Sequence, residues 1–498
     1  MHNEQVFTPK HVVDKILIEL EYCGDNIRKH HIMDNSCGDG AFLCRVATLY
    51  INTCIMDNLS KEETCRELAE YIHGIEIDSE LYHKTLENLK NITDSYSLEE
   101  VKWDIVNADA MDVNCYDNKM DYVVGNPPYC NVHDLGDRYD KVTSYKFAQG
   151  GMTDLYLVFF EIGINMLNEN GKLGYITPNS WLTSLAGANF RKYLLESKTL
   201  IEIHQYGHTK IFDNATTYTC LTFLSKKPKD TNYFILTFEN TTYKVINGTG
   251  VRRNILEKLD NCSVGGKFYL CDNPNTLKLI HDVFETSKVF KGVNTRIRVK
   301  NGFATLNDKF FMMDDFINEN PEYKDNDNVL EVVKASNGET HWFFYPYDKE
   351  GKAIKDIEKE GIDKKLLDYI YEKCDKHDVS RSETGWWLYG RTQAINDVKY
   401  DKIVVNNLIR DVEDLKIRVL ENEGNKQYGV YSGYYIPIGE EFFKKPITKE
   451  IIIDAIKNDD FVRYIKAVGN YKNGGYYTFS SKDLENWLNF YCFKPKFL

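Results

Sequence analysis

The sequence lacks several features that would place it outside the ordinary globular proteins. No apolar run approaches the roughly 20 residues needed to cross a bilayer, and the first residues, MHNEQVFTPK, contain no basic segment followed by an apolar one. The 12 cysteines are scattered without a CxxC pair, which disfavours a disulfide or zinc framework. These absences predict a cytoplasmic protein that has reduced thiols, no bound metal and no membrane association.

An excess of basic residues, which is common in nucleic-acid binders, is also missing. The formal net charge is −13, and residues 1–239 hold 22 of the 62 Lys and Arg but 35 of the 75 Asp and Glu. The rest of the chain is therefore neutral overall. A protein can hold DNA through local basic patches on an acidic body, so the charge weakens a DNA-binding function without excluding it.

The chain has 498 residues, of which 42% are hydrophobic and 28% charged, and this length favours two globular domains. From Thr8 to about Ser225, short apolar runs alternate with helical patterns, which is typical of βαβ units around a mostly parallel sheet. Beyond about residue 240 the expected strands are short and aromatic-rich, with polar stretches between them. We predict an α/β domain over residues 1–239 and a mixed α+β domain over residues 240–498.

The first domain is expected to contain seven strands and a long apolar helix. The helix is expected at residues 154–167, and the strands are expected at residues 31–34, 71–78, 105–108, 122–125, 172–177, 200–206 and 217–224. This number of strands suits a doubly wound sheet.

The strongest chemical signal is Asn126-Pro127-Pro128-Tyr129, directly after the apolar strand at 122–125. Ligands of open α/β sheets bind beyond the carboxyl ends of the strands. The two prolines stiffen the turn, so the Asn126 side-chain oxygen and the Pro127 carbonyl can accept both hydrogens of an exocyclic amino group. These two hydrogen bonds would direct the lone pair of the amino nitrogen at an electrophilic methyl group. Tyr129 offers a flat surface on which the base can stack. A simple structural turn is the alternative, because four-letter motifs recur by chance.

Other chemical groups follow the neighbouring strands. Residues 34–40 form a turn in which Gly38 and Gly40 give a GxG pattern, but Leu43 stands where a third dinucleotide-type glycine would fall, which disfavours NAD or FAD. Glu76 ends the second strand, where a carboxylate grips ribose hydroxyls, and Asp109 after the third strand can accept from an adenine amino group. Each acid alone is more often a solvated charge, and only the ordered set indicates a nucleotide-type cofactor.

In this order, five segments resemble motifs X, I, II, III and IV of the gamma-class DNA adenine-N6 methyltransferases, the TaqI type. They are Phe7-Thr8-Pro9, DNSCGDGAFL, GIEID, NADA and NPPY. Later segments resemble motifs V to VIII and landmarks of that family's C-terminal recognition domain, namely Asp154–Leu167, Gly171–Leu182, KIFDNATTYTCLTFL, Gly302–Thr305, Asp308–Phe311 and GGYYTFSSKDLENWL. Where the family usually has DPACGSG, this chain has Asn35, Ser36 and Asp39 in place of Pro, Ala and Ser.

The resemblance implies a Rossmann-like S-adenosylmethionine-dependent methyltransferase sheet followed by a target recognition domain that binds double-stranded DNA. It implies methyl transfer to N6 of an adenine flipped out of a short recognition sequence. By position, the cofactor-binding residues would be Thr8, Asp34, Cys37, Gly38 and Gly40 for the methionine part, Glu76 for the ribose and Asp109 for the adenine, together with Ala110 and Asn126. The catalytic residues would be Asn126, Pro127, Tyr129 and Phe212, although core packing is an equal alternative for Phe212.

Basic and aromatic residues of the second half are weaker signals. Arg296, Arg298 and Lys300 alternate as on one strand face, and further candidates for DNA contact are Lys334, Trp386, Trp387, Arg391 and Arg410. A solvated charge or a core aromatic is the more common role of such residues.

Three other functions remain open. NPPY also occurs in enzymes that methylate protein glutamine or RNA bases, although these enzymes resemble only the first half of the chain. A bifunctional restriction and methylation enzyme usually has a nuclease domain before the first motif, whereas seven residues precede Thr8 and no PD…ExK-like cluster is found. Cleavage is therefore expected to require a separate cognate endonuclease. The third function is non-catalytic DNA binding by a degenerate methyltransferase fold.

Overall fold

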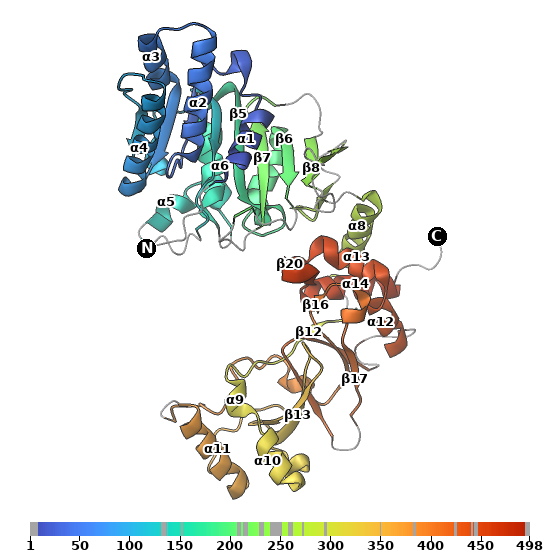
Figure 1. Cartoon of the computed structure of the whole chain (residues 1–498). Helices are drawn as coiled ribbons and strands as arrows, with labels where there is room; N and C mark the ends of the chain where they lie inside the picture. The colour runs from blue at the N-terminus through green and yellow to red at the C-terminus, as the bar shows by residue number, and fades with distance from the viewer. Residues whose placement is uncertain are drawn as a thin grey trace. The chain divides into compact units, whose positions relative to one another are not determined.

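The computed structural model divides the chain into two compact units, Met1–Asp272 and Asn273–Leu498 (Figure 1). The structure describes residues 8–130, 136, 138–150, 153–206, 211–212, 218–228, 234–239, 251–256, 262–270, 273–292, 296–348, 350–381, 385–422, 426–439, 442 and 447–493. The division follows Asp272, whereas the sequence predicts it at 239/240. The reason is that strand β9 (Val251–Leu256) pairs with β8 (Phe234–Glu239) and continues the sheet of the first unit beyond residue 239.

A nine-stranded sheet organises the first unit in the order β3-β2-β1-β4-β5-β7-β6-β8-β9. Strands β3, β2, β1, β4 and β5 are parallel neighbours, β7 is antiparallel to both β5 and β6, and β8 is parallel to β6. The remaining strand bounds are β1 (Ile32–Asp34), β2 (Ile72–Glu76), β3 (Asp104–Asn107), β4 (Met120–Gly125), β5 (Leu167–Pro178), β6 (Leu200–Gln205), β7 (Thr219–Ser225), β10 (Ser263–Val264) and β11 (Lys267–Phe268). The last two pair as a separate short hairpin.

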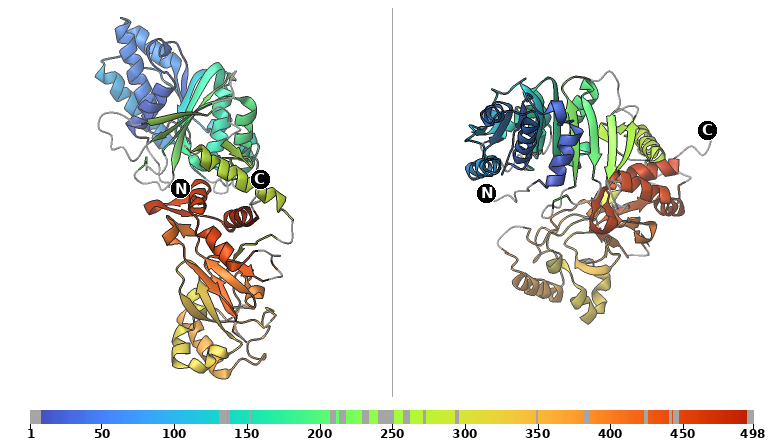
Figure 2. Two further views of the ribbon diagram at one scale, coloured as in Figure 1. Left: turned by 90° about the vertical axis from the view of Figure 1, so that its right-hand side faces the viewer. Right: turned by 45° about the horizontal axis from the view of Figure 1, so that its top comes forward.

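Helices cover both faces of this sheet, because successive strand residues point to opposite sides and both sides are apolar. Ile32 packs with helices α1 (Lys10–Glu19), α2 (Ala41–Met56), α3 (Lys61–Tyr71) and α4 (Ser79–Ser95), whereas the next residue, Met33, packs with helices α5 (Tyr139–Thr143), α6 (Leu155–Met166) and α7 (Ala188–Ser197). Figure 2 shows the helical layers from two further directions. The predicted α/β fold with a mostly parallel central sheet is confirmed, and each predicted strand has its counterpart among β1 to β7.

The second unit is a mixed α+β structure, as the sequence predicts. Its described residues form three small sheets, in the orders β12-β19-β15-β17, β14-β13-β18 and β16-β21-β20. The strands are β12 (Lys300–Asn301), β13 (Val329–Lys334), β14 (Thr340–Phe344), β15 (Asp401–Val405), β16 (Leu408–Ile409), β17 (Ile417–Leu420), β18 (Tyr428–Tyr431), β19 (Tyr434–Ile438), β20 (Asn470–Lys472) and β21 (Tyr476–Thr478). The helices are α8 (Pro274–Val289), α9 (Asp308–Phe311), α10 (Asp314–Glu319), α11 (Lys364–Lys376), α12 (Lys449–Ile456), α13 (Asp459–Val468) and α14 (Ser481–Phe493).

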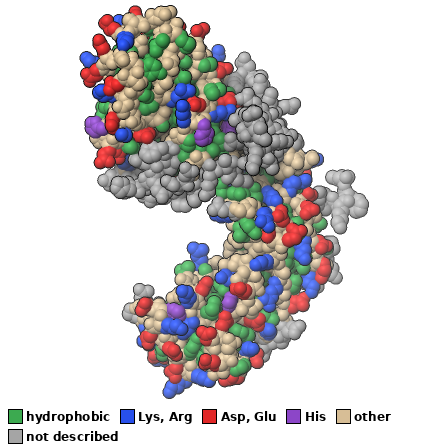
Figure 3. Space-filling view, in the orientation of Figure 1, with side chains coloured by type: hydrophobic (Ala, Val, Ile, Leu, Met, Phe, Trp, Pro, Cys, Tyr) green, Lys and Arg blue, Asp and Glu red, His purple; other side chains and the backbone are tan. Residues whose placement is uncertain are grey.

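Charge on the second unit is mixed on the face that Figure 3 shows. Blue and red side chains alternate over this unit without a continuous region of one sign. This agrees with the neutral balance of the chain beyond residue 239. Within the described residues, no helix combines the length and the apolar character that a membrane span requires.

Candidate active site

A pocket of about 440 Å³ lies at the carboxyl ends of the parallel strands of the first unit. Strands β1 and β4 are neighbours here, with Asp34 in register with Val124, and the strand order reverses between them. Such a switch point is where open α/β sheets bind ligands, and the volume is typical of a small-molecule site. The fold therefore brings the segment after β1 and the segment after β4 to one cavity.

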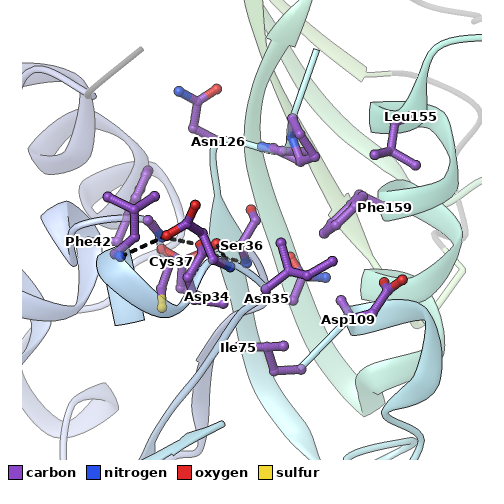
Figure 4. Close-up of a pocket in the computed structure, with 18 of the residues that line it drawn as sticks. Asp34, Asn35, Ser36, Cys37, Phe42, Ile75, Asp109, Asn126, Leu155 and Phe159 are labelled. Atoms are coloured by element: carbon purple, nitrogen blue, oxygen red, sulfur yellow. Dashed lines mark hydrogen bonds between the residues drawn. The ribbon is translucent and has the colours of Figure 1, made fainter. Parts of the chain in front are cut away.

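Most of the predicted site residues line this pocket. They come from the segment before α1, the end of β1 and the turn after it, and the ends of β2, β3 and β4, and they are Thr8, Asp34, Cys37, Gly38, Glu76, Asp109, Ala110, Asn126, Pro127 and Tyr129. In Figure 4, Asn126 and Asp109 lie on different sides of the turn that carries Asp34, while Leu155 and Phe159 project from α6.

Two predicted residues lie elsewhere. Gly40 is the residue before α2 and has a φ of +90°, so its place in the turn depends on a backbone conformation that suits glycine. Phe212 is 4% exposed and belongs to the apolar cluster that includes α1 and α2, against which Tyr129 also packs. The structure places Phe212 in the core rather than on the pocket lining, which is the packing alternative given above.

The glycine turn is fixed by hydrogen bonds to the second strand and to α4. Gly38 donates its backbone N–H to Glu76 Oε2 at 2.8 Å, and Thr85 Oγ1 donates to the Gly38 carbonyl at 2.7 Å. Cys37 donates its backbone N–H to the Ile75 carbonyl at 3.0 Å. Because β2 holds the turn in this way, the backbone at Gly38 faces the pocket without a side chain over it.

Glu76 links the turn to the start of α4. Its carboxylate accepts from Gly38 through one oxygen and from the Asp78 backbone N–H at 2.8 Å through the other, and the side chain is buried. A carboxylate oxygen has two lone pairs, so each oxygen keeps one for a hydroxyl donor in the pocket. Burial raises the pKa of Glu76, and these backbone hydrogen bonds oppose the rise.

Asp109 is held by a backbone group and a cation. Its Oδ1 accepts from the Met111 N–H at 3.0 Å, and its Oδ2 lies 2.9 Å from Arg138 Nη2 and 3.8 Å from Lys141 Nζ. Arg138 also lines the pocket and is the cation among its described lining residues. No sequence motif indicates Arg138, because it reaches Asp109 from a loop after β4.

The segment after β4 carries an internal hydrogen bond that the sequence does not predict. The Tyr129 hydroxyl donates to Asn126 Oδ1 and also lies 3.3 Å from the Ile176 carbonyl. The Tyr129 ring is half-buried and meets Tyr156 edge-on at 6.4 Å between ring centroids. The Tyr129 hydroxyl thus occupies one lone pair of Asn126 Oδ1.

Acidic groups dominate the electrostatics of the pocket. Asp34 is buried, and burial raises the pKa of its carboxyl to about 8, with Glu76 and Asp39 adding to the rise and the Ser36 backbone N–H opposing it. Burial also raises the pKa of the Cys37 thiol. Such a pocket favours a ligand with positive charge, because a cation offsets the desolvation of the carboxylates.

Asn35 has a structural role that the sequence does not indicate. Its Oδ1 accepts from the Tyr175 hydroxyl of β5 at 2.9 Å, which ties the glycine turn to the centre of the sheet. Asn35 is one of the departures from the DPACGSG pattern, and a proline could not make this bond. Among the described residues, no group of three His, Cys, Asp or Glu side chains is arranged to hold a metal ion.

Residues 44–212 match the Eco57I restriction-modification methylase family. The matched region includes Glu76, Asp109 and the NPPY segment. The chain is 24% identical over 494 residues to the type II restriction enzyme and methyltransferase RM.Eco57I of Escherichia coli, a match that covers 81% of the chain and 49% of the relative. It is 28% identical over 223 residues to the type II methyltransferase M.BstVI of Geobacillus stearothermophilus, covering 43% of the chain and 40% of the relative.

The chain thus contains an Eco57I-type restriction-modification methylase domain, has type II methyltransferase homologues and spans about half or less of the length of these relatives. Solved structures share its fold. The type IIL restriction-modification enzyme MmeI, in complex with DNA, aligns with a TM-score of 0.58 and 14% identity over 96% of this chain and 64% of that one. A nuclease-deletion mutant of the type ISP enzyme LlaGI, in complex with a DNA substrate mimic, aligns with a TM-score of 0.54 and 13% identity. This alignment covers 97% of this chain and 46% of that one.

Proposed function

We propose that this chain transfers the methyl group of S-adenosylmethionine to N6 of an adenine in a short DNA sequence. The observation that carries the proposal is the position of Asn126 and Pro127. They leave β4 at the switch point of the sheet and line the same pocket as Asp34, Glu76 and Asp109. An amide oxygen and a carbonyl beside a nucleotide-sized, acidic pocket suit methyl transfer to an exocyclic amino group.

The residues of the pocket fit this cofactor. Buried carboxylates suit its ammonium and sulfonium charges and its ribose hydroxyls, and Gly38 leaves backbone accessible. The 16-residue helix α2 begins directly after Gly40, so the positive end of its dipole suits the cofactor's carboxylate. When bound, S-adenosylmethionine supplies an electrophilic methyl group on a sulfonium. We assign the methionine part to Asp34 and the glycine turn, the ribose to Glu76, and the adenine to Asp109.

The protein's own contribution to the reaction would be positioning. Asn126 Oδ1 and the Pro127 carbonyl would accept the two amino hydrogens of the target adenine, which keeps its nitrogen lone pair directed at the methyl group. The hydrogen bond from Tyr129 holds the Asn126 amide in one orientation before the base arrives. The Tyr129 ring would then stack on the base, which offsets part of the cost of removing it from the duplex.

The second unit would select the DNA sequence. MmeI was solved in complex with DNA and LlaGI with a DNA substrate mimic, and the chain aligns with those enzymes over nearly its whole length, including the second unit. The two type II relatives are named as methyltransferases, one of them also as a restriction enzyme. These names support DNA over RNA or protein as the substrate, and we propose that any cleavage of the same sequence needs a separate endonuclease.

Transfer of tritiated methyl from S-adenosylmethionine to unmethylated plasmid DNA tests the proposal. The wild-type chain should label the plasmid, Asn126→Ala should not, and long-read sequencing should place the mark at one short motif. Structured RNA and a bacterial protein extract are offered in parallel reactions. Label on either of these and not on the plasmid would contradict the proposal, as would cutting of the plasmid by the purified chain with Mg²⁺ alone.

A further inference from the structure

Leu306 of the second unit combines two unfavourable features. It lies in the segment Gly302–Asn307 between β12 and α9, its side chain is 75% exposed, and its backbone φ is +66°. Among the described non-glycine residues with positive φ, Leu306 is the apolar one, since the others are Glu, Lys, Asn, Ser and Asp. A left-handed leucine is strained, and residues held in this way concentrate at functional surfaces.

The surrounding structure holds Leu306 rigidly. Ala304 exchanges two backbone hydrogen bonds with Arg391, at 3.1 and 2.9 Å, and the Thr305 hydroxyl donates to Asp308. Asn307 caps α9 through the Phe310 N–H. A Cβ atom on Gly390 would lie 2.2 Å from Leu306 Cδ1, so the leucine side chain lies directly over the Gly390 backbone. Leu306 is therefore a fixed projection and not the tip of a loose loop.

Cations without carboxylate partners border this segment. Arg391 and Lys309 are exposed, and no ion pair between either of them and another described residue is seen. On the other border, Phe303 pairs with Tyr431, whose ring lies 6.0 Å from Lys334 Nζ. Arg391, through its backbone pairing with Ala304, and Lys309, three residues after Leu306, thus place two exposed cations beside the apolar projection.

The nearby carboxylates are engaged within the fold. Asp308 accepts from Thr305, Asp314 accepts from the His341 ring and the Trp342 N–H, and Glu339 is bound by Asn337. These hydrogen bonds hold the carboxylates within the fold, whereas the exposed Arg391 and Lys309 can reach phosphates.

We infer that Leu306 is an apolar wedge that inserts into the base stack of bound DNA, with Arg391 and Lys309 on the flanking phosphates. This inference rests on the proposed DNA methyltransferase function. Leucine side chains that enter between base steps unstack and kink a duplex, and a rigid backbone is needed to force them in. The strain at Leu306 is then the consequence of placing this side chain where DNA meets it, in a chain that must remove a base from the duplex.

Two variants of Leu306 test the inference, with Val289→Ala as the matched control. Val289 is also in the second unit and 72% exposed, but it ends a regular helix. The probes are fluorescein-labelled duplexes with the motif that plasmid sequencing identifies. Leu306→Ala and Leu306→Asn should bind about tenfold or more weakly, because a buried leucine contact is lost. Leu306→Asn should keep or raise the melting temperature, because asparagine tolerates left-handed backbone.

A second set of duplexes carries one mismatched pair at successive positions. A mismatch lowers the cost of unstacking, so at one position the Leu306 variants should regain wild-type affinity. Binding within twofold of the wild type on the matched duplex would overturn the inference. An equal loss on every duplex together with a lower melting temperature would overturn it too, because it would show a structural role. Methyl transfer to DNA by the wild-type chain is measured before the variants are compared. If the wild-type chain transfers no methyl group to DNA, the proposed function itself has failed.

Discussion

The protonation of Asp34 gives the sharpest physical prediction for the pocket. In the folded protein, burial raises the pKa of Asp34 to about 8, against an ordinary value of 3.8. The folded state therefore holds a proton on Asp34 across a pH range in which the unfolded chain has lost it. Folded stability should fall as the pH rises from about 4 to about 8, because the carboxyl must be ionised in a buried site with Glu76 and Asp39 nearby.

The size of the effect follows from linkage. One buried carboxyl of this kind changes the free energy of unfolding by about 1.4 kcal/mol for each pH unit inside the window. Between pH 6 and pH 8 the loss is about 2 kcal/mol, because titration of the folded group is half complete at the upper end. For a unit of this size, such a loss lowers the melting temperature by about 5 °C.

The assay is thermal unfolding of the cofactor-free protein at pH 6, 7 and 8, with Asp34→Asn measured under the same conditions. The wild-type protein should lose stability relative to the variant as the pH rises, since the variant has no proton to release. In the wild type, affinity for S-adenosylmethionine should rise over the same range, because the ionised carboxylate is the form that pairs with the cofactor's ammonium. A difference between wild type and Asp34→Asn that is constant from pH 6 to pH 8 would refute the reasoning.

Two further predictions concern the residues around the cofactor and the base. Glu76→Gln should weaken binding of S-adenosylmethionine about tenfold to a hundredfold in titration calorimetry, because an amide nitrogen cannot accept from a backbone N–H or a ribose hydroxyl. The control is Glu80→Gln, a substitution at an exposed position. Equal affinities of the two variants for S-adenosylmethionine would contradict the ribose-binding role of Glu76. Tyr129→Ala should lower kcat about tenfold to a hundredfold and leave cofactor binding intact. Tyr129→Phe should lower kcat less, because it removes the hydrogen bond to Asn126 but keeps the aromatic ring. Undiminished turnover of Tyr129→Ala would exclude stacking as a large contribution.

The location of the pocket could be predicted from the sequence because it depends on strand ends. Asp34, Glu76, Asp109 and Asn126 each follow an apolar run, and parallel strands bring their carboxyl ends to one edge. The pattern of a polar residue after each apolar strand therefore predicts which side chains meet at the pocket. The roles assigned to these four residues remain predictions, since lining a pocket does not show what they bind.

Other parts of the site could not be read from local pattern. Arg138 and Tyr175 reach the pocket residues from distant segments, and their contacts depend on packing that one sequence does not encode visibly. The division lies after Asp272 and not at 239/240 because β9, whose sequence VRRNIL has two central arginines and no clear apolar run, pairs with β8 of the first sheet. The role of Phe212 could not be predicted, because the position of a single aromatic residue in the sequence does not distinguish a core residue from a pocket residue.

Identification of the methylated base tests the central claim most directly. Plasmid DNA treated with the wild-type chain and S-adenosylmethionine is digested to nucleosides, which are separated and identified by mass spectrometry, with DNA treated with Asn126→Ala as the reference. The account predicts N6-methyladenine in the wild-type sample alone. Methylcytosine in its place, or no methylated nucleoside although S-adenosylmethionine binds, would contradict it.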